Sequence, residues 1–192
     1  MSFAGFWAKD FFEHMHQFIE SDSFHLSEIY WISFLFSALI ISFFAKSKKT
    51  IITTLLTLSS IGIISSLVMC IPVLFNYYGS LVWCIFSGIS ASGIVLAFAL
   101  IPYYTDYHIV GISIALNNTF LVIGGLCAQV VFGLVVNSNM NYIVGLNLND
   151  NIDINYYYGL VFLLVLSSIA LCSVIFLTNN IKKQERADYN TI

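Results

Sequence analysis

The side chains best suited to recognise a solute are amides inside a long apolar stretch. Asn117, Asn118 and Gln129 lie within residues 109–136, a segment without Asp, Glu, Lys or Arg. Lipid offers no hydrogen bonds, so an amide in such a segment usually faces other helices or a water-filled cavity. These side chains can donate and accept hydrogen bonds there, which makes them candidates for lining a solute path.

Helical periodicity places the polar and small residues of this segment on one face. At about 100° per residue, Gly111, Asn118, Gly125 and Gln129 fall within about 40° of one another, and Gly133 lies about 40° further round. The face could line a substrate path or a seam along which two groups of helices slide. It could equally serve tight packing, with the amides bonded to neighbouring helices, and the two roles are compatible.

Small residues also predict helix contacts elsewhere. Gly88 and Ser92 are four residues apart and form a small-xxx-small pattern, which favours close approach of two helices. Serines of the second apolar stretch, including Ser65 and Ser66, can bond back to the carbonyl four residues earlier. The residues expected to pack helices together are Gly88, Ser92, Gly111, Gly124, Gly125 and Gly133.

Residues for enzyme or metal chemistry are scarce. His14 and His16 lie beside Glu13, but residues two apart on a helix point about 200° away from each other. The four cysteines lie in apolar runs without a CxxC pair and are expected to be small buried hydrophobes. We therefore expect no catalytic residues, no metal and no cofactor, and a protein that is not an enzyme.

The composition shows what kind of chain must position these residues. Of 192 residues, 59% are hydrophobic and 9% are charged, against about 25% charged in an ordinary soluble domain. A solvated surface and a disordered chain both need more polar residues. Seven Lys and Arg residues do not form the basic face of a nucleic-acid binder. The expected partner is instead the lipid bilayer.

Segment lengths predict an all-α polytopic membrane protein with five transmembrane helices. A helix needs about 20 apolar residues to cross about 30 Å of hydrocarbon. Residues 1–28 are expected to hold a partial helix and an extracytoplasmic amphipathic segment, and residues 179–192 a cytoplasmic tail. The five stretches of the transmembrane bundle, residues 29–178, are 29–45, 51–71, 80–101, 109–136 and 156–178.

The lysines predict the orientation of the chain. Lys and Arg near helix ends stay on the cytoplasmic side of a membrane. Five spans put residues 46–49 and the tail with Lys182, Lys183 and Arg186 on one side, and this side holds six of the seven basic residues. Four or six spans would separate the two clusters. We expect this side, and with it the C-terminus, to be cytoplasmic.

The glycine- and amide-rich segment resembles a known helix. Residues 111–137, GISIALNNTFLVIGGLCAQVVFGLVVN, are similar to the eleventh helix of bacterial major facilitator superfamily transporters. The family pattern has Gly, Asn, Gly-Gly, Gln-Pro, Gly and a closing Asp, and this chain has Val130 and Asn137 at the proline and acid positions. Residues 3–7, FAGFW, resemble the end of the seventh helix, and the following segments resemble helices eight to twelve.

The resemblance implies the C-terminal half of a twelve-helix transporter, truncated within the seventh helix. In that family two six-helix halves enclose a central cavity that opens alternately to each side. The implied function is transport of a small solute across the inner membrane, with a separate N-terminal half as partner. Asn118, Gln129, Trp7, Tyr30 and Trp31 would then face a shared cavity along the substrate path.

A different reading stays open beside the transporter. A self-standing five-helix membrane protein could use the face with Gly111, Gly125 and Gly133 to form a homo- or hetero-oligomer, with a structural or partner-binding role and no transport. The sequence does not identify the solute. It does not identify a coupling ion either, because no acid or histidine lies within the five stretches.

Overall fold

The computed structural model describes residues 7–16, 18–70, 76–137 and 151–190. Side chains are described within 7–13, 18–70, 76–136 and 158–180. The described residues form helices and no strand, which confirms the all-α prediction. Most of the FAGFW segment, the Asn-rich stretch 138–150 and the side chains of His14, His16 and the basic tail lie outside these limits.

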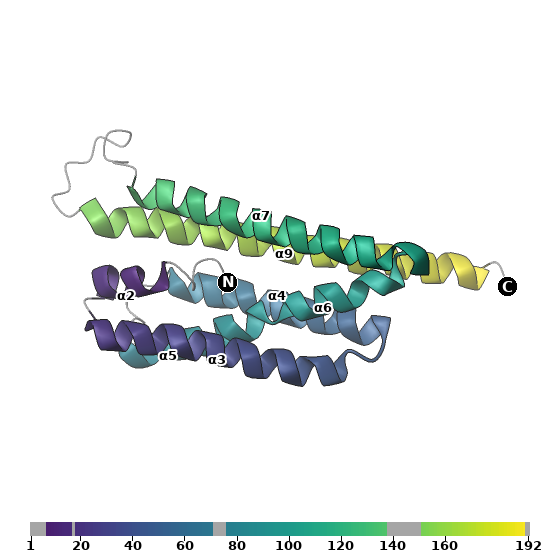
Figure 1. The fold of residues 1–192 in the computed structure, drawn as a ribbon, viewed down its shortest axis with the longest axis horizontal. Coiled ribbons are helices and arrows are strands. Elements are labelled where there is room, and N and C mark those ends of the chain that lie inside the picture. The colour runs from purple at the N-terminus through teal and green to yellow at the C-terminus, as the bar shows by residue number, and fades with distance from the viewer. Residues whose placement is uncertain (1–6, 17, 71–75, 138–150, 191–192) are drawn as a thin grey trace.

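The chain forms long helices joined by short connections. We use the labels of Figure 1. The α-helices are α2 (Ala8–His16), α3 (Glu20–Phe44), α4 (Lys48–Met69), α5 (Tyr77–Ala91), α6 (Gly93–Leu100), α7 (Val110–Asn137) and α9 (Asn151–Asn190), with short 3-10 helices η2 (Ile101–Tyr103) and η3 (Tyr107–Ile109) before α7.

Five helical segments of the described chain are long and apolar enough to cross a membrane. Their number matches the sequence prediction, and the chain is a polytopic all-α protein. The segments are Glu20–Phe44, Lys48–Met69, Tyr77–Tyr103, Tyr107–Val136 and Tyr158–Asn180.

The helix ends differ from the predicted apolar stretches. The first spanning helix was expected from residue 29, but α3 begins at Glu20 and carries Glu20 and Asp22 in its first turn. Acidic side chains are stabilised there by the helix dipole, although they lower the hydropathy of the segment. At the other end of the chain, α9 continues through the polar tail to Asn190.

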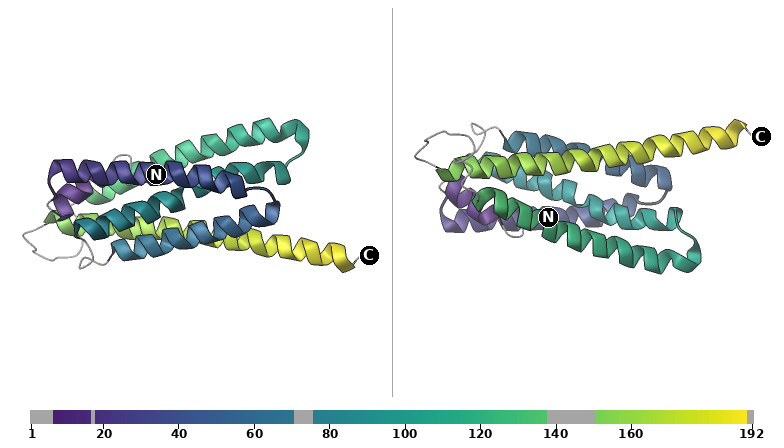
Figure 2. Two further views of the ribbon diagram at one scale, coloured as in Figure 1. Left: turned by 90° about the horizontal axis from the view of Figure 1, so that it is seen from below. Right: turned by 90° about the horizontal axis from the view of Figure 1, so that it is seen from above.

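The helices form two groups. The long helices α7 and α9 lie side by side, and α9 also packs against α4. In the second group α3 lies beside α5 and α4 lies beside α5 and α6, while the short α2 covers one end (Figures 1 and 2). The α3–α4 turn and the C-terminal end of α9 lie at the same end of the bundle, as the five-span prediction requires.

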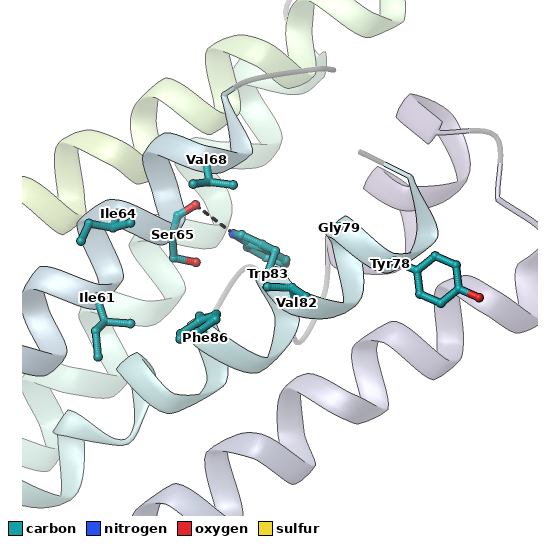
Figure 3. Close-up of a pocket in the computed structure, with 9 residues that line it drawn as sticks. All are labelled: Ile61, Ile64, Ser65, Val68, Tyr78, Gly79, Val82, Trp83 and Phe86. Carbon is teal, nitrogen blue, oxygen red and sulfur yellow. Dashed lines mark hydrogen bonds between the residues drawn. The ribbon is translucent and has the colours of Figure 1, made fainter. Parts of the chain in front are cut away.

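Serine and tryptophan side chains join the helices by hydrogen bonds. Ser37 and Ser92 pair at 2.9 Å between α3 and the end of α5, and Ser66 bonds Ser167 of α9 at 3.0 Å. Ser65 pairs with Ser87 of α5, and its carbonyl accepts a 3.1 Å bond from Trp83 Nε1 (Figure 3). Ser66 also bonds back to Gly62 as expected, so these serines hold helices together as well.

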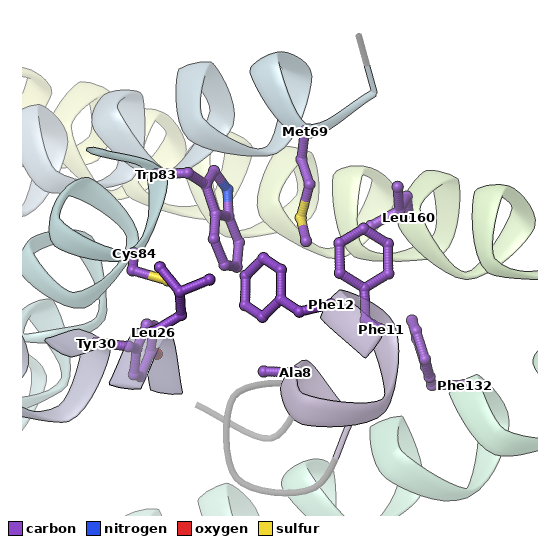
Figure 4. Packing of buried hydrophobic residues seen from close by; sticks show 10 residues of the cluster. All are labelled: Ala8, Phe11, Phe12, Leu26, Tyr30, Met69, Trp83, Cys84, Phe132 and Leu160. Carbon is purple, nitrogen blue, oxygen red and sulfur yellow. The ribbon is translucent and has the colours of Figure 1, made fainter. Parts of the chain in front are cut away.

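The buried core consists of two small clusters. One contains aromatic side chains from α2, α3, α5 and α7, with Phe12 fully buried and its ring 6.0 Å from that of Trp83 (Figure 4). The other is aliphatic and lies toward the α3–α4 turn. Only 6% of the most apolar part of Tyr107–Val136 is buried, against 28% in Lys48–Met69. Most apolar surface therefore faces outward, as suits a protein dissolved in lipid.

Candidate functional site: the uncovered face of α7

Helix α7 is anchored mainly near its C-terminal end. Phe132 is 2% exposed and packs closely against Gly159 of α9, where an added Cβ would lie 2.6 Å from its ring. Trp7 contacts the same turn, with its ring 5.4 Å from that of Phe132. An added Cβ on Gly133 would lie 2.8 Å from the Trp7 ring. The rest of α7 makes far fewer close contacts with the described chain.

The predicted solute-binding amides lie on the less covered part of α7. Asn118 is exposed, while Asn117 and Gln129 are half-buried. Neither Asn118 nor Gln129 hydrogen-bonds through its side chain to another described residue. Polar groups in hydrocarbon are costly without a hydrogen-bonding partner. Asn118 therefore needs water, a solute or a helix from outside the described chain.

Two glycines of α7, Gly111 and Gly124, point away from the rest of the described chain. An added Cβ on Gly111 or Gly124 would meet nothing within 4 Å, and Gly125 is half-buried. Gly133 is the exception because Trp7 lies on it. We define the α7 face as Gly111, Asn118 and Gln129. Gly124 is open as well, but it lies about 120° from Asn118 around the helix. The α7 face offers an open glycine, and amides that have no hydrogen-bonding partner among the described residues.

The aromatic residues of the predicted path do not join the α7 amides in one site. Tyr30 is 4% exposed and lies in the aromatic cluster with Leu26 and Cys84 (Figure 4). Trp31, whose ring is 5.4 Å from Tyr30, is 39% exposed. Trp7 packs on α7 near Gly133. A cavity shared by all five residues stays a prediction about the complete assembly.

Gly88 and Ser92 lie where α3 and α5 come closest. An added Cβ on Gly88 would lie 2.5 Å from the carbonyl oxygen of Tyr30 and 2.9 Å from Ser33 Cβ. Ser92 is fully buried and bonds Ser37. These two small residues thus allow the contact between the two helices.

Charged side chains lie at the ends of the helices. Lys9 Nζ donates a 2.7 Å hydrogen bond to Glu20, lies 3.7 Å from Glu13 and sits over the Phe24 ring. The bond to Glu20 raises the pKa of Lys9 above its usual 10.5. Lys48 lies 4.2 Å from the centre of the Tyr104 ring at the other end. Among the residues that the structure describes, no group of three His, Cys, Asp or Glu could hold a metal.

The aromatic residues that anchor α2 were not predicted from the sequence. Phe11 and Phe12 are 1% and 0% exposed and fix α2 against the bundle. Their adjacent position in a short charged segment was the available signal, since two neighbouring phenylalanines among acids and lysine need an apolar partner. The hydropathy of a 20-residue window hides such a short helix.

Comparisons with protein-family models, with curated proteins and with solved structures gave no match to this chain.

Proposed function

We propose that the chain is one half of a secondary transporter for a small solute, related to the major facilitator superfamily. The observation that carries the proposal is Asn118, an exposed amide on a membrane-spanning helix without a hydrogen-bonding partner among the described residues. A water-filled path along α7 would solvate this amide. The resemblance of residues 111–137 to an eleventh transporter helix supports the same reading.

The proposal includes a partner and an orientation. A separate N-terminal half would cover the α7 face and complete the central cavity. The chain would lie in the inner membrane with its C-terminus in the cytoplasm, because the α3–α4 turn and the end of α9 share one end of the bundle and carry six of the seven basic residues.

Thiol labelling tests whether Asn118 meets water. The native cysteines, Cys70, Cys84, Cys127 and Cys172, are replaced by alanine, and one cysteine is placed at residue 118. The matched control carries its cysteine at residue 120, about 200° away on the helix, where Phe120 is 71% exposed. Both variants are treated in membranes with a water-soluble maleimide, which reacts with thiols that reach water.

The account predicts labelling at residue 118 and protection at residue 120. Added solute of the transported class should slow labelling at 118 only. Protection of both positions under all conditions would contradict a water-filled path and would leave α7 as a packing helix.

The open glycines favour a second function, which is association with another membrane helix. Gly111 and Gly124 contact nothing within 4 Å of an added Cβ, and glycines of this kind let two backbones approach closely in lipid. Such a chain would act through a homo- or hetero-oligomer without transporting a solute.

Gly111→Leu tests association without disturbing the fold of the chain. The new side chain enters open space in the chain itself, so only an intermolecular contact would suffer. The oligomeric state is measured in detergent by light scattering, with Phe120→Leu as control. Loss of an oligomer in the glycine variant alone supports association, whereas a monomer in all three proteins removes the basis for this function.

A further inference from the structure

We propose that a groove between α4 and α5 binds one acyl chain of a zwitterionic phospholipid. The groove has a volume of about 550 Å³ and lies between the C-terminal half of α4 and the first turns of α5 (Figure 3). The residues that line it include Ile64, Ser65, Gly79, Val82, Trp83 and Phe86.

The groove offers an apolar surface in which the polar atoms of its floor are already bonded. Ser65 Oγ pairs with Ser87, and Trp83 Nε1 donates to the Ser65 carbonyl. A ligand therefore gains free energy from apolar contact and needs no hydrogen bonds in the groove. This chemistry fits a hydrocarbon chain and disfavours a polar solute.

The position of the groove in the fold identifies the source of that hydrocarbon. Both flanking helices belong to membrane-spanning segments, and the groove opens to the side, since Ile64, Val82 and Phe86 at its rim are 61%, 51% and 48% exposed. Helix contacts in lipid favour small residues, but among the described residues that line the groove only Gly79 and Ser65 are small. A flexible acyl chain fits between such bulky rim residues better than another helix.

One mouth of the groove is suited to a headgroup. Tyr78 is 75% exposed in the first turn of α5, and tyrosine at the end of a spanning helix typically lies at the headgroup level. By chain position, seven of the ten acidic residues and one of the seven basic residues belong to this end of the protein. Such a charge disfavours an anionic headgroup, so we assign a zwitterionic lipid.

Fluorescence quenching by brominated lipids tests the groove. Replacing Trp7 and Trp31 with phenylalanine leaves Trp83 as the single tryptophan of the three. Trp83 is 7% exposed, so lipid in the surrounding layer reaches it through the groove. The matched reporter keeps Trp31, which is 39% exposed, and has phenylalanine at residues 7 and 83. Both proteins are reconstituted in phosphatidylcholine with brominated acyl chains.

The proposal predicts quenching of Trp83 as strong as that of Trp31. Gly79→Leu and Val82→Phe fill the groove from its floor and rim, and each should remove most of the quenching of Trp83. The same substitutions should leave Trp31 unchanged, and circular dichroism confirms that each variant is folded. Quenching of Trp31 without quenching of Trp83 would overturn the proposal. Equal or stronger quenching of Trp83 by brominated phosphatidylglycerol would overturn the assignment of a zwitterionic lipid.

This result is independent of the transporter proposal. Asn118 labelling reports on α7, whereas Trp83 quenching reports on the groove between α4 and α5, so each can fail alone.

Discussion

Two glycines show how differently one residue type is used in this protein. Gly88 lies against the backbone of α3, with an added Cβ 2.5 Å from the Tyr30 carbonyl oxygen, while Gly124 faces open space on α7. The first is required by a contact within the chain. The second, in a helix interior where alanine is more favourable, indicates a contact that the chain does not make by itself.

Alanine substitution at the two glycines should have opposite effects on stability. Gly88→Ala forces α3 and α5 apart and should lower the free energy of unfolding by about 1–3 kcal/mol, as overpacking does. Gly124→Ala should raise it by about 0.5–1 kcal/mol through helix propensity. Unfolding in mixed detergent micelles measures both. Equal effects of the two substitutions would show that the contact at Gly88 is not tight.

The serine pair between α3 and α5 should contribute a measurable coupling energy. Ser37 and Ser92 are 8% and 0% exposed and bond at 2.9 Å. Hydrogen bonds between membrane helices contribute about 0.6 kcal/mol on average and up to about 1.7 kcal/mol. A double-mutant cycle with Ser37→Ala and Ser92→Ala should give a coupling in this range. Ser37→Ala combined with Ser42→Ala, whose hydroxyl bonds its own helix, serves as the uncoupled control.

At the scale of elements, α2 is fixed by aromatic contacts and by one ion pair. Phe12 fills the core beside Trp83, and Lys9 bonds Glu20 in the first turn of α3. The pKa of Lys9 is raised, chiefly by this bond, so the folded state binds the proton more tightly than the unfolded state. The contribution to stability is complete below the usual pKa of 10.5 and is lost as the pH rises through the folded value.

Alkaline pH should therefore remove the difference between the native chain and Lys9→Met. Below about pH 10 the native chain should be the more stable of the two, and the gap should close as the pH rises above the unfolded pKa of Lys9. Unfolding midpoints measured across this range for both proteins isolate the contribution of Lys9. A gap that stays constant with pH would contradict a role for the protonated amine.

The existence and order of the spanning helices could be predicted from hydropathy, but their ends could not. Five uncharged stretches specify five helices because each must satisfy its backbone within lipid. The start of α3 at Glu20 depends on the helix dipole and on Lys9 from α2. The break between α5 and α6 at Ser92 depends on packing against Ser37. Both are tertiary effects, which a window average does not contain.

At the scale of the molecule, the chain has a positive end and a negative end. Six basic residues and three acids belong by chain position to the end with the α3–α4 turn, and one basic residue and seven acids belong to the other. By the positive-inside rule, this distribution of Lys and Arg supports the proposed orientation with the basic end toward the cytoplasm.

The candidate site could be located from the sequence only in part. Periodicity placed Asn118 and Gln129 on one face of α7, and in the structure Asn118 is exposed while Gln129 is half-buried. Helical periodicity did not show that Tyr30 lies in the core while Trp31 next to it points outward. What covers α7 is outside the described chain, so neither periodicity nor packing specifies it.

The orientation of the two basic segments tests the five-span architecture most directly. Reporter enzymes that are active on only one side of a membrane are fused after residue 48 and after residue 185, with a further fusion after residue 147 as the opposite-side control. The account predicts that the first two fusions report the cytoplasm and the third the outer side. Reporters at residues 48 and 185 in opposite compartments would contradict the five-span architecture, and the proposed transporter half with it.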